Sequence, residues 1–270
     1  MRSQPLLAIL LTLAALCLPG CSSPETKAPP PAPEPERVTP GVMVKVAAGE
    51  FTLGSDVAPT GEKRAGPYSP ARKVNLPDFW IDKYEVTNGE FLKFSAESDY
   101  KALGDWRPFA QLGMIDHPVI NVMLDDAKAY CKWRGRRLPT EQEWEKAARG
   151  VDGRDYPWGT KWESGRTNTF ESGQKRPVEV GRMAGDVSPF GVHDMFGNVQ
   201  EWTGSAYKAY PGGPRDDDYG LGMQVVRGGS SAGYGNAKEL PLKIWFRAAF
   251  PPESQYGIGF RCASDSAPER

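Results

Sequence analysis

The stretch from Asp194 to Glu201 contains two carboxylates that could bind a hard cation. Calcium takes about six to eight oxygens, which carboxylates, side-chain amides and backbone carbonyls supply. Gly197 lies between the two carboxylates and predicts a turn whose carbonyls can point inward. The stretch therefore favours a calcium site. In the alternative interpretation, Asp194 only caps the turn and Glu201 pairs with a nearby arginine.

Side chains for other chemistries are scarce. The chain has 4 Cys and 2 His, and the histidines are His117 and His193. Two histidines exclude a multi-histidine metal centre and leave little room for a Ser-His-Asp triad. His193 is expected to pack or to lie on the surface, and Ser230 lacks a plausible base. The acidic run at 216–218 could bind a cation, but a solvated loop is the better interpretation.

Composition and charge restrict the class of protein. With 33 basic and 34 acidic side chains, the net charge of -1 gives no reason to expect a nucleic-acid partner. The 30 Gly and 25 Pro predict a chain rich in turns and loops. A length of 270 residues allows one large domain or two small ones.

Short elements must position these side chains. Capping boxes at Thr87-Glu90 and Thr140-Glu143 predict helices near 88–97 and from 141 to Gly150, and a third helix is expected at 125–133. Alternating or apolar runs predict strands at 42–46, 50–54, 79–86, 199–203, 224–227, 244–249 and 259–263. After residue 150, Gly, Pro and aromatic residues are interleaved. We therefore expect an α+β domain with low regular secondary structure.

Residues 1–20 have the features of a lipoprotein signal peptide. An apolar run at 6–18 follows Arg2 and is too short to span a bilayer. Leu18-Pro19-Gly20-Cys21 resembles a bacterial lipobox, in which the cysteine is lipidated; an ordinary secretory signal is the alternative. Ser22 after Cys21 favours the outer membrane. We expect a lipid-anchored protein of the cell envelope that faces the periplasm.

Residues 21–40 contain seven prolines. Such a segment stays extended, so it predicts a Pro-rich stalk between the anchor and the folded domain.

The chain from 42 to 263 resembles the formylglycine-generating enzyme, or sulfatase-modifying factor, family in motif order and spacing. The matching stretches are DKYEVTN (82–88), HPV (117–119), DAKAYCKW (126–133), RLPTEQEWE (137–145), YPWG (156–159), SPFGVHDMFGNVQEW (188–202), RGGS (227–230) and GFRC (259–262). The resemblance implies a C-type-lectin-like fold over 41–264, followed by a short tail at 265–270.

The resemblance also implies ligands and a cross-link. A structural Ca²⁺ would be bound by the side chains of Asp194 and Glu201 and the carbonyls of Gly197 and Val199. A second site would use Asn168 and the carbonyl of Thr169, but the Asp that the family places later is not found before Pro177. Cys131 and Cys262 match a family disulfide. A reactive or metal-binding pair of these cysteines is the alternative.

This chain lacks the residues that bind copper in the family's enzymes. Those enzymes hold Cu(I) with two cysteine thiolates shortly after the RGGS segment, and soft thiolates are what Cu(I) selects. The matching positions here are Gly233 and Lys238, and no cysteine lies between Cys131 and Cys262. We therefore expect no copper and no authentic formylglycine synthesis.

Two functions remain. The favoured one is a non-catalytic, membrane-tethered binding or regulatory module with an envelope protein partner, in a secretion or kinase-linked signalling assembly. The alternative is a family oxidase that acts on a sulfatase or another substrate, as in siderophore maturation, by non-standard residues. The candidate ligand-binding residues lie from the RGGS segment to the last strands, and they are Ser230, Ser231, Tyr234, Trp245, Arg247 and Arg261.

Overall fold

The computed structural model describes residues 39–58, 66–231 and 243–268. The predicted lipidation site Cys21, the candidate ligand residue Tyr234 and the copper-equivalent positions Gly233 and Lys238 lie outside the described residues. Within the described part of the chain, no helix has the length and apolar character needed to cross a bilayer.

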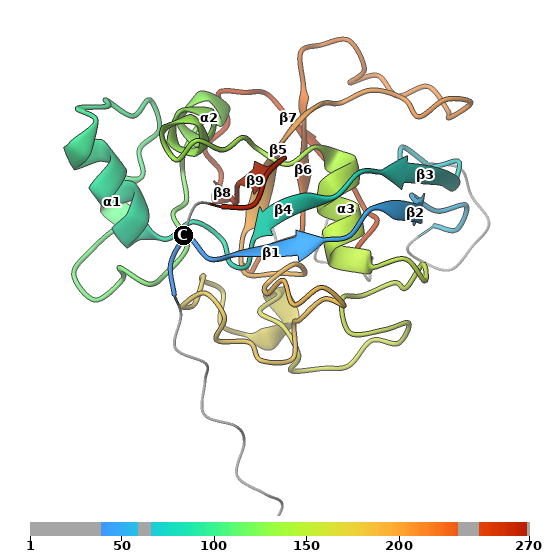
Figure 1. The fold of residues 1–270 in the computed structure, drawn as a ribbon, viewed down its shortest axis with the longest axis horizontal. Coiled ribbons are helices and arrows are strands. Elements are labelled where there is room, and N and C mark those ends of the chain that lie inside the picture. The colour runs from blue at the N-terminus through green and yellow to red at the C-terminus, as the bar shows by residue number, and fades with distance from the viewer. Residues whose placement is uncertain (1–38, 59–65, 232–242, 269–270) are drawn as a thin grey trace, which may run out of the picture. The chain divides into compact units, whose positions relative to one another are not determined.

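The described strands form three sheets (Figure 1). The first has the antiparallel order β1-β4-β9, built from Met43–Val46, Phe79–Asp82 and Ala263–Ser264. The second pairs β2 (Gly49–Leu53) with β3 (Arg72–Leu76). The third has the order β7-β6-β5-β8, built from Ala248–Phe250, Gln224–Arg227, Gln200–Ala206 and Ile258–Phe260, and its β5-β8 pair is parallel. The first sheet thus joins the two ends of the described domain.

Three α-helices accompany the sheets: α1 (Asn88–Glu97), α2 (Leu124–Trp133) and α3 (Glu141–Arg149). The predicted capping boxes at Thr87-Glu90 and Thr140-Glu143 are both present and begin α1 and α3. Gly150, with φ 72°, ends α3. Two short 3₁₀ helices lie at Arg107–Phe109 and Phe170–Ser172. The long region between α3 and β5 otherwise has no regular structure among its described residues, as the composition predicts.

The strand predicted at 79–86 is only half correct, because β4 ends at Asp82. Beyond it the backbone turns away from β1: the Val86 N–H donates to the Phe260 carbonyl at 2.9 Å, and Val119 N–H donates to the Val86 carbonyl at 2.9 Å. The predicted strand at 259–263 is divided into β8 and β9. The predicted strand at 244–249 is reduced to β7, and β3 was not predicted.

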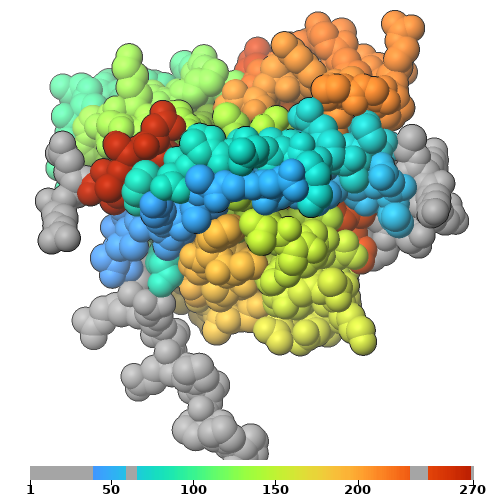
Figure 2. All heavy atoms as spheres, turned by 45° about the vertical axis from the view of Figure 1, so that its right-hand side comes forward, coloured from blue at the N-terminus to red at the C-terminus, as the bar shows by residue number. Residues whose placement is uncertain are grey.

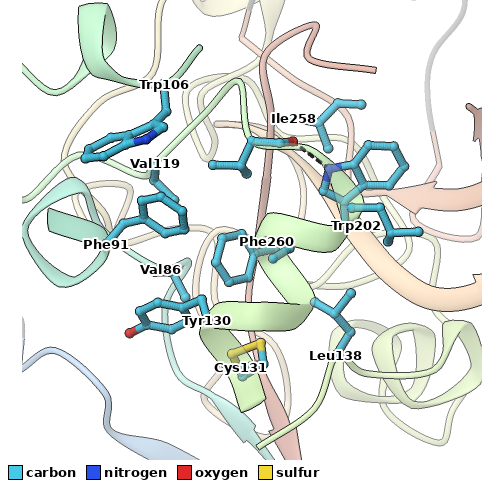
Figure 3. Close-up of a cluster of buried hydrophobic side chains, with 14 of the residues drawn as sticks. Val86, Phe91, Trp106, Val119, Tyr130, Cys131, Leu138, Trp202, Ile258 and Phe260 are labelled. Atoms are coloured by element: carbon cyan, nitrogen blue, oxygen red, sulfur yellow. Dashed lines mark hydrogen bonds between the residues drawn. A yellow bond between two sulfur atoms is a disulfide. The ribbon is translucent and has the colours of Figure 1, made fainter. Parts of the chain in front are cut away.

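The largest core cluster lies between α1, α2 and the β5-β8 pair (Figure 3). Phe91 and Phe260 pack edge to face with ring centroids 6.2 Å apart, and the Trp202 indole donates to the Val122 carbonyl at 2.9 Å. Cys131 and Cys262 form a disulfide inside this cluster, with their Cα atoms 5.6 Å apart. The cross-link therefore joins α2 to the segment between β8 and β9.

A second cluster surrounds α3. Trp144, Ala147 and Ala148 are fully buried, as their helical spacing predicts, and they pack with Phe79 and Ile81 of β4. In the space-filling view, β1 and the strands after it (blue to cyan) run side by side across one face of the domain (Figure 2). The architecture is the predicted α+β fold of the C-type-lectin-like kind, with little regular structure.

Candidate functional site

The predicted calcium stretch forms a tight turn with an unusual backbone. Asp194 and Asn198 have positive φ angles of 56° and 55°, and Gly197 has φ 120°. A Cβ added at Gly197 would lie 2.6 Å from the carbonyl oxygen of Asn168. The Asn198 N–H donates to that carbonyl at 2.7 Å, and the Gly197 N–H donates to the Gly228 carbonyl at 3.1 Å. The turn is thus held against two other segments, and the second residue of RGGS is one of its neighbours.

Four carboxylates are buried around this turn: Glu85, Asp186, Asp194 and Glu201 are each at most 1% exposed. Asp186 Oδ2 accepts from the Phe196 N–H at 3.0 Å, and the Asp194 N–H donates to the Asp186 carbonyl at 3.1 Å. We call these four residues the carboxylate cluster. Burying so many negative charges is costly unless a cation or a proton accompanies them.

Asn198 joins the cluster to the segments at 85, 168 and 178. Its Nδ2 donates to Glu85 Oε2 at 3.1 Å, and its Oδ1 accepts from the Val178 N–H at 2.9 Å. Asn168 Nδ2 donates to the same Oδ1 at 3.1 Å. Each of these groups is buried, so the Asn198 amide fixes the relative position of three segments that are distant in the sequence.

Arg261 supplies the cation that contacts the cluster directly. Its Nη2 lies 2.6 Å from Glu201 Oε1 and its Nε lies 2.8 Å from Glu201 Oε2. The Trp144 indole also donates to Glu201 Oε2 at 2.8 Å. Glu201 therefore pairs with an arginine, as in the alternative interpretation of the sequence.

Asp194, unlike Glu201, has one carboxylate oxygen without a partner among the described residues. Its Oδ2 accepts from the Gly181 N–H at 2.5 Å, whereas its Oδ1 is buried without a hydrogen-bond partner in the described structure. Burial raises the pKa of Asp194 to about 7, although the Gly181 N–H and Arg261 oppose the shift. Asp194 is thus a buried carboxylate with one oxygen available for a proton or a cation.

The other two carboxylates share this property. One oxygen of Glu85 and one of Asp186 are also buried without a partner among the described residues. Burial, followed by the negative charge of Asp194, raises the pKa of both carboxyls well above their usual range. One guanidinium therefore faces three carboxylates that are incompletely paired, besides Glu201.

The predicted calcium ligands fit an ion unequally. Asp194 Oδ1 fits, because a calcium ion would supply the partner that this oxygen lacks. Glu201 fits poorly, because Arg261 and Trp144 occupy both of its oxygens. Within the described ranges, no group of three or more His, Cys, Asp or Glu side chains is placed to hold a metal. That finding does not bear on a site built from one or two carboxylates and backbone carbonyls.

The second predicted set, Asn168 and Thr169, lies beside Ser172. The Ser172 hydroxyl lies 3.0 Å from Asn168 Oδ1 and 2.7 Å from the Thr169 carbonyl oxygen. One protein hydroxyl thus contacts both oxygens that the ion would take. The second calcium site stays a prediction.

The described candidate ligand-binding residues are buried and fall into separate surroundings. The Ser231 hydroxyl donates to the Asn198 carbonyl at 3.1 Å, whereas Ser230 Oγ is buried without a partner among the described residues. Trp245 Nε1 donates to Asp155 Oδ1 at 3.2 Å. Among these residues, Arg261 contacts the carboxylate cluster through Glu201, and Ser231 contacts Asn198 beside it.

Arg247 belongs to a second buried charge network, which is built on Glu141 and Glu145 of α3. Its Nη2 donates to Glu141 Oε2 at 2.8 Å, and Arg227 Nη1 donates to Glu141 Oε1 at 2.9 Å. Arg227 Nη2 also reaches Glu145 Oε2 at 2.7 Å. These ion pairs tie β6 and Arg247 to α3, so this network is a scaffold for the two elements.

Sequence reasoning missed Glu85, Asp186 and Asn198. Glu85 lies in a predicted strand, where an inward carboxylate has no local signal. Asn198 follows the predicted Gly197 turn, and its tolerance of positive φ was the one available hint. His193 packs against Tyr84 with ring centroids 5.0 Å apart, in agreement with its expected packing role.

The chain is similar to several known proteins. A family model, the sulfatase-modifying factor enzyme 1-like domain, matches residues 28–266. The chain is 32% identical over 276 residues to inactive C-alpha-formylglycine-generating enzyme 2 of Bos taurus, covering 82% of this chain and 87% of that protein. It is 30% identical over 315 residues to the formylglycine-generating enzyme of Bos taurus, covering 90% and 80%. The structure of PvdO from Pseudomonas aeruginosa is similar with a TM-score of 0.66 and 27% identity, covering 82% and 93%.

Proposed function

Since the chain belongs to the sulfatase-modifying factor enzyme 1-like family, we propose that it is a binding or regulatory module of that family without the copper chemistry. The observation that carries this proposal is the state of its cysteines. Cys131 and Cys262 are joined to each other, and the remaining two cysteines precede residue 22. No thiolate pair is left in the domain to hold Cu(I).

The relatives include one that is named inactive and one that is named as an enzyme. They are inactive C-alpha-formylglycine-generating enzyme 2 and formylglycine-generating enzyme, both of Bos taurus. The buried surroundings of Arg247, Trp245 and Arg261 favour a scaffold role for these residues, because each already satisfies a partner within the chain. Recognition of a partner would then depend on the segment at Ser230, whose hydroxyl lacks a hydrogen-bond partner among the described residues, since loops on a rigid frame commonly carry binding.

A membrane tether suits such a module. Cys21, at the end of a lipobox-like sequence, would carry the lipid, and the Pro-rich residues 21–40 would separate the domain from the outer membrane. An anchored protein meets its partners by proximity. We propose an envelope protein as partner, within a secretion or kinase-linked signalling assembly.

A structural calcium ion is part of this proposal. Asp194 Oδ1 and the carbonyls of Gly197 and Val199 would bind it, while Glu201 stays paired with Arg261 and contributes its charge rather than an oxygen. Two observations support the ion: the unpartnered Asp194 oxygen and the surplus of buried carboxylates over Arg261. Its chemistry would be structural, because it would neutralise charge and hold the turn at Gly197.

The catalytic alternative can be tested directly with a matched pair of proteins. Wild type and the double variant Gly233→Cys, Lys238→Cys are incubated with a sulfatase-derived cysteine peptide, Cu(I) and O₂, and aldehyde formation is measured by mass spectrometry. We expect no conversion by wild type, and Cu(I) binding only by the double variant. Copper-dependent turnover by wild type would overturn the proposal.

Binding itself is tested in the native envelope. The anchored protein is cross-linked, solubilised and purified, and the cross-linked peptides are identified by mass spectrometry. An unrelated lipoprotein with the same tag is the control. We expect one envelope protein cross-linked near the RGGS segment in stoichiometric amount. Cross-links to the control's partners alone would contradict a specific binding module.

A further inference from the structure

A cavity of about 340 Å³ is lined largely by the loop that connects α1 and α2. No residue of the carboxylate cluster lines it, and neither do the described candidate ligand residues. Much of its wall is apolar and is formed by Phe109, Leu112, Met114, Pro118, Ile120 and Pro177. Small-molecule sites in proteins are commonly about 300–1,000 Å³ and mostly apolar, with few polar groups. The cavity has the size and lining of such a site.

The loop that lines the cavity is held in place by Asn88, the first residue of α1. Asn88 Nδ2 donates to the carbonyls of Phe109 at 3.2 Å and Met114 at 2.9 Å. The backbone N–H of Asn88 donates to the His117 carbonyl at 2.9 Å. The start of the helix and the loop thus form one hydrogen-bonded unit, so the wall of the cavity is in position before a ligand binds.

Arg176 is the one charged side chain among the described residues that line the cavity. Its backbone carbonyl accepts from Asn168 Nδ2 at 3.0 Å, whereas its exposed guanidinium has no hydrogen-bond or ion-pair partner among the described residues. His117 also lines the cavity, but burial lowers the pKa of its imidazole, so His117 adds no charge at neutral pH. The lining therefore offers one accessible positive charge beside an apolar wall.

The acidic groups near the cavity leave the Arg176 guanidinium free for a ligand. Glu179 and Asp116 are the carboxylates that act on His117. Glu179 pairs with Arg182 at 3.3 Å, and Asp116 is exposed outside the lining, where water and salt screen its charge. A carboxylate matches a guanidinium because its two oxygens accept two parallel N–H bonds. One free guanidinium balances one negative charge, so the lining favours a monoanion.

We propose that this cavity binds a small amphiphilic monoanion, with its apolar body against the wall and its carboxylate on Arg176. Because Arg176 is exposed, the carboxylate keeps part of its hydration while it pairs with the guanidinium. An inorganic anion would leave the apolar wall in contact with water, and a purely apolar molecule would gain nothing from Arg176. This inference goes beyond the proposed binding of an envelope partner and does not depend on it.

Three probes separate the two parts of the proposed ligand. Octanoate has both the chain and the carboxylate, 1-octanol has the chain alone, and acetate has the carboxylate alone. Each is titrated at neutral pH into the ¹⁵N-labelled protein. The signal to follow is the backbone amide of Gly113, which lines the cavity; Gly220, which does not, is the reference. We expect saturable shifts with octanoate and about tenfold weaker binding of the other two probes, the equivalent of about 1.4 kcal/mol.

Two pairs of variants at exposed positions then locate the binding. Arg176→Gln removes the positive charge from the lining, and Lys175→Gln removes the same charge from the neighbouring position outside it. Leu112→Glu places a negative charge in the lining, and Leu103→Glu places one elsewhere on the same loop.

We expect the two lining variants to bind octanoate about tenfold more weakly than wild type, and the two control variants to bind it like wild type. Arg176→Gln should bind 1-octanol unchanged, because the charge acts only on the carboxylate. No saturable shift with octanoate, equal affinity for octanoate and 1-octanol, or equal octanoate binding by Arg176→Gln and Lys175→Gln would overturn the proposal.

Discussion

Arg261 and Glu201 form a bidentate ion pair in which both side chains are completely removed from solvent. Arg261 also donates to the carbonyls of Asp82 at 3.2 Å and His193 at 3.0 Å. The Arg261 guanidinium therefore connects the segment between β8 and β9 to β4, to β5 and to His193, which precedes the turn at Gly197. Because a buried pair of this kind is costly to separate, it fixes which segments meet around the carboxylate cluster.

Replacing Arg261 by Met should destabilise the domain strongly. The substitution leaves Glu201 buried and unpaired, and removal of one partner of a buried pair typically costs about 3–5 kcal/mol. Urea denaturation followed by tryptophan fluorescence measures the change. Arg182→Met is the control, since Arg182 pairs with Glu179 on the surface and should cost less than about 1 kcal/mol. Equal losses of unfolding free energy in the two variants would show that the buried pair contributes no more to stability than the surface pair.

The disulfide should contribute a large share of the stability. It joins residues that are 131 positions apart, and loss of a native disulfide typically costs about 2–5 kcal/mol. The double variant Cys131→Ala, Cys262→Ala should show this loss in oxidising buffer. Under a strong reductant, the wild type should approach the variant. A wild type and a variant that melt together in oxidising buffer would exclude the contribution.

Local signals in the sequence predicted the helices well. The capping boxes at Thr87-Glu90 and Thr140-Glu143 act within one turn of helix, so their effect is visible in a few neighbouring residues. Strand ends were predicted poorly because distant contacts decide them. Asp82 ends β4 where its carboxylate accepts from the Cys262 N–H, 180 residues away. No window of local sequence contains both partners.

In the candidate site, too, the residues with a local sequence signal were predicted and those that depend on long-range contacts were not. Asp194 and Gly197 were candidates because a carboxylate near a glycine turn is a local pattern and because the family resemblance implied the same residues. Glu85 and Asn198 were missed because their contact spans 113 residues. The sequence also left open whether Glu201 binds calcium or an arginine, and the choice of Arg261 depends on how β8 lies beside β5.

Substitution of Cys21 should release the protein from the membrane. If Cys21 is lipidated, Cys21→Ser removes the acyl chains that supply membrane affinity of roughly 0.8 kcal/mol per buried CH₂. Fractionation of cells, with labelling by an alkyne palmitate analogue, measures both the anchor and its loss. Cys17→Ser is the matched control, because Cys17 lies inside the apolar run. Unchanged fractionation of Cys21→Ser, together with an unlabelled wild type, would exclude lipidation.

Calcium should stabilise the wild type. An ion that binds only the folded state adds RT ln(1 + [L]/Kd), which is about 2.7 kcal/mol at a calcium concentration a hundredfold above Kd. For a domain of this size, that corresponds to roughly 5–10 °C in Tm. Differential scanning calorimetry in millimolar calcium and in EGTA measures the shift.

Two variants assign the calcium effect to Asp194. Asp194→Ala should not respond to calcium, whatever its Tm in EGTA. Asp217→Ala, in the exposed acidic run, should respond like wild type. Identical melting of the wild type in both buffers would exclude the ion, and loss of the response in Asp217→Ala would move it to the acidic run.

Asp82 should make the stability fall as the pH rises through neutrality. Burial raises the pKa of Asp82 to about 7, against the opposing effects of Arg136 at 2.6 Å and the Cys262 N–H. A carboxyl with a raised pKa in the folded state binds its proton more tightly there than in the unfolded chain. Its contribution is therefore complete below about pH 4 and is lost as the pH rises through about 7. A shift of this size is worth roughly 4 kcal/mol at most.

Urea denaturation between pH 5 and 8 should show the fall, and Asp82→Asn, which cannot titrate, should make it smaller. A residual fall is expected from Asp194, whose pKa is also raised to about 7. If Arg136 instead dominates, the wild type will hold its stability up to pH 8 and lose it below pH 4.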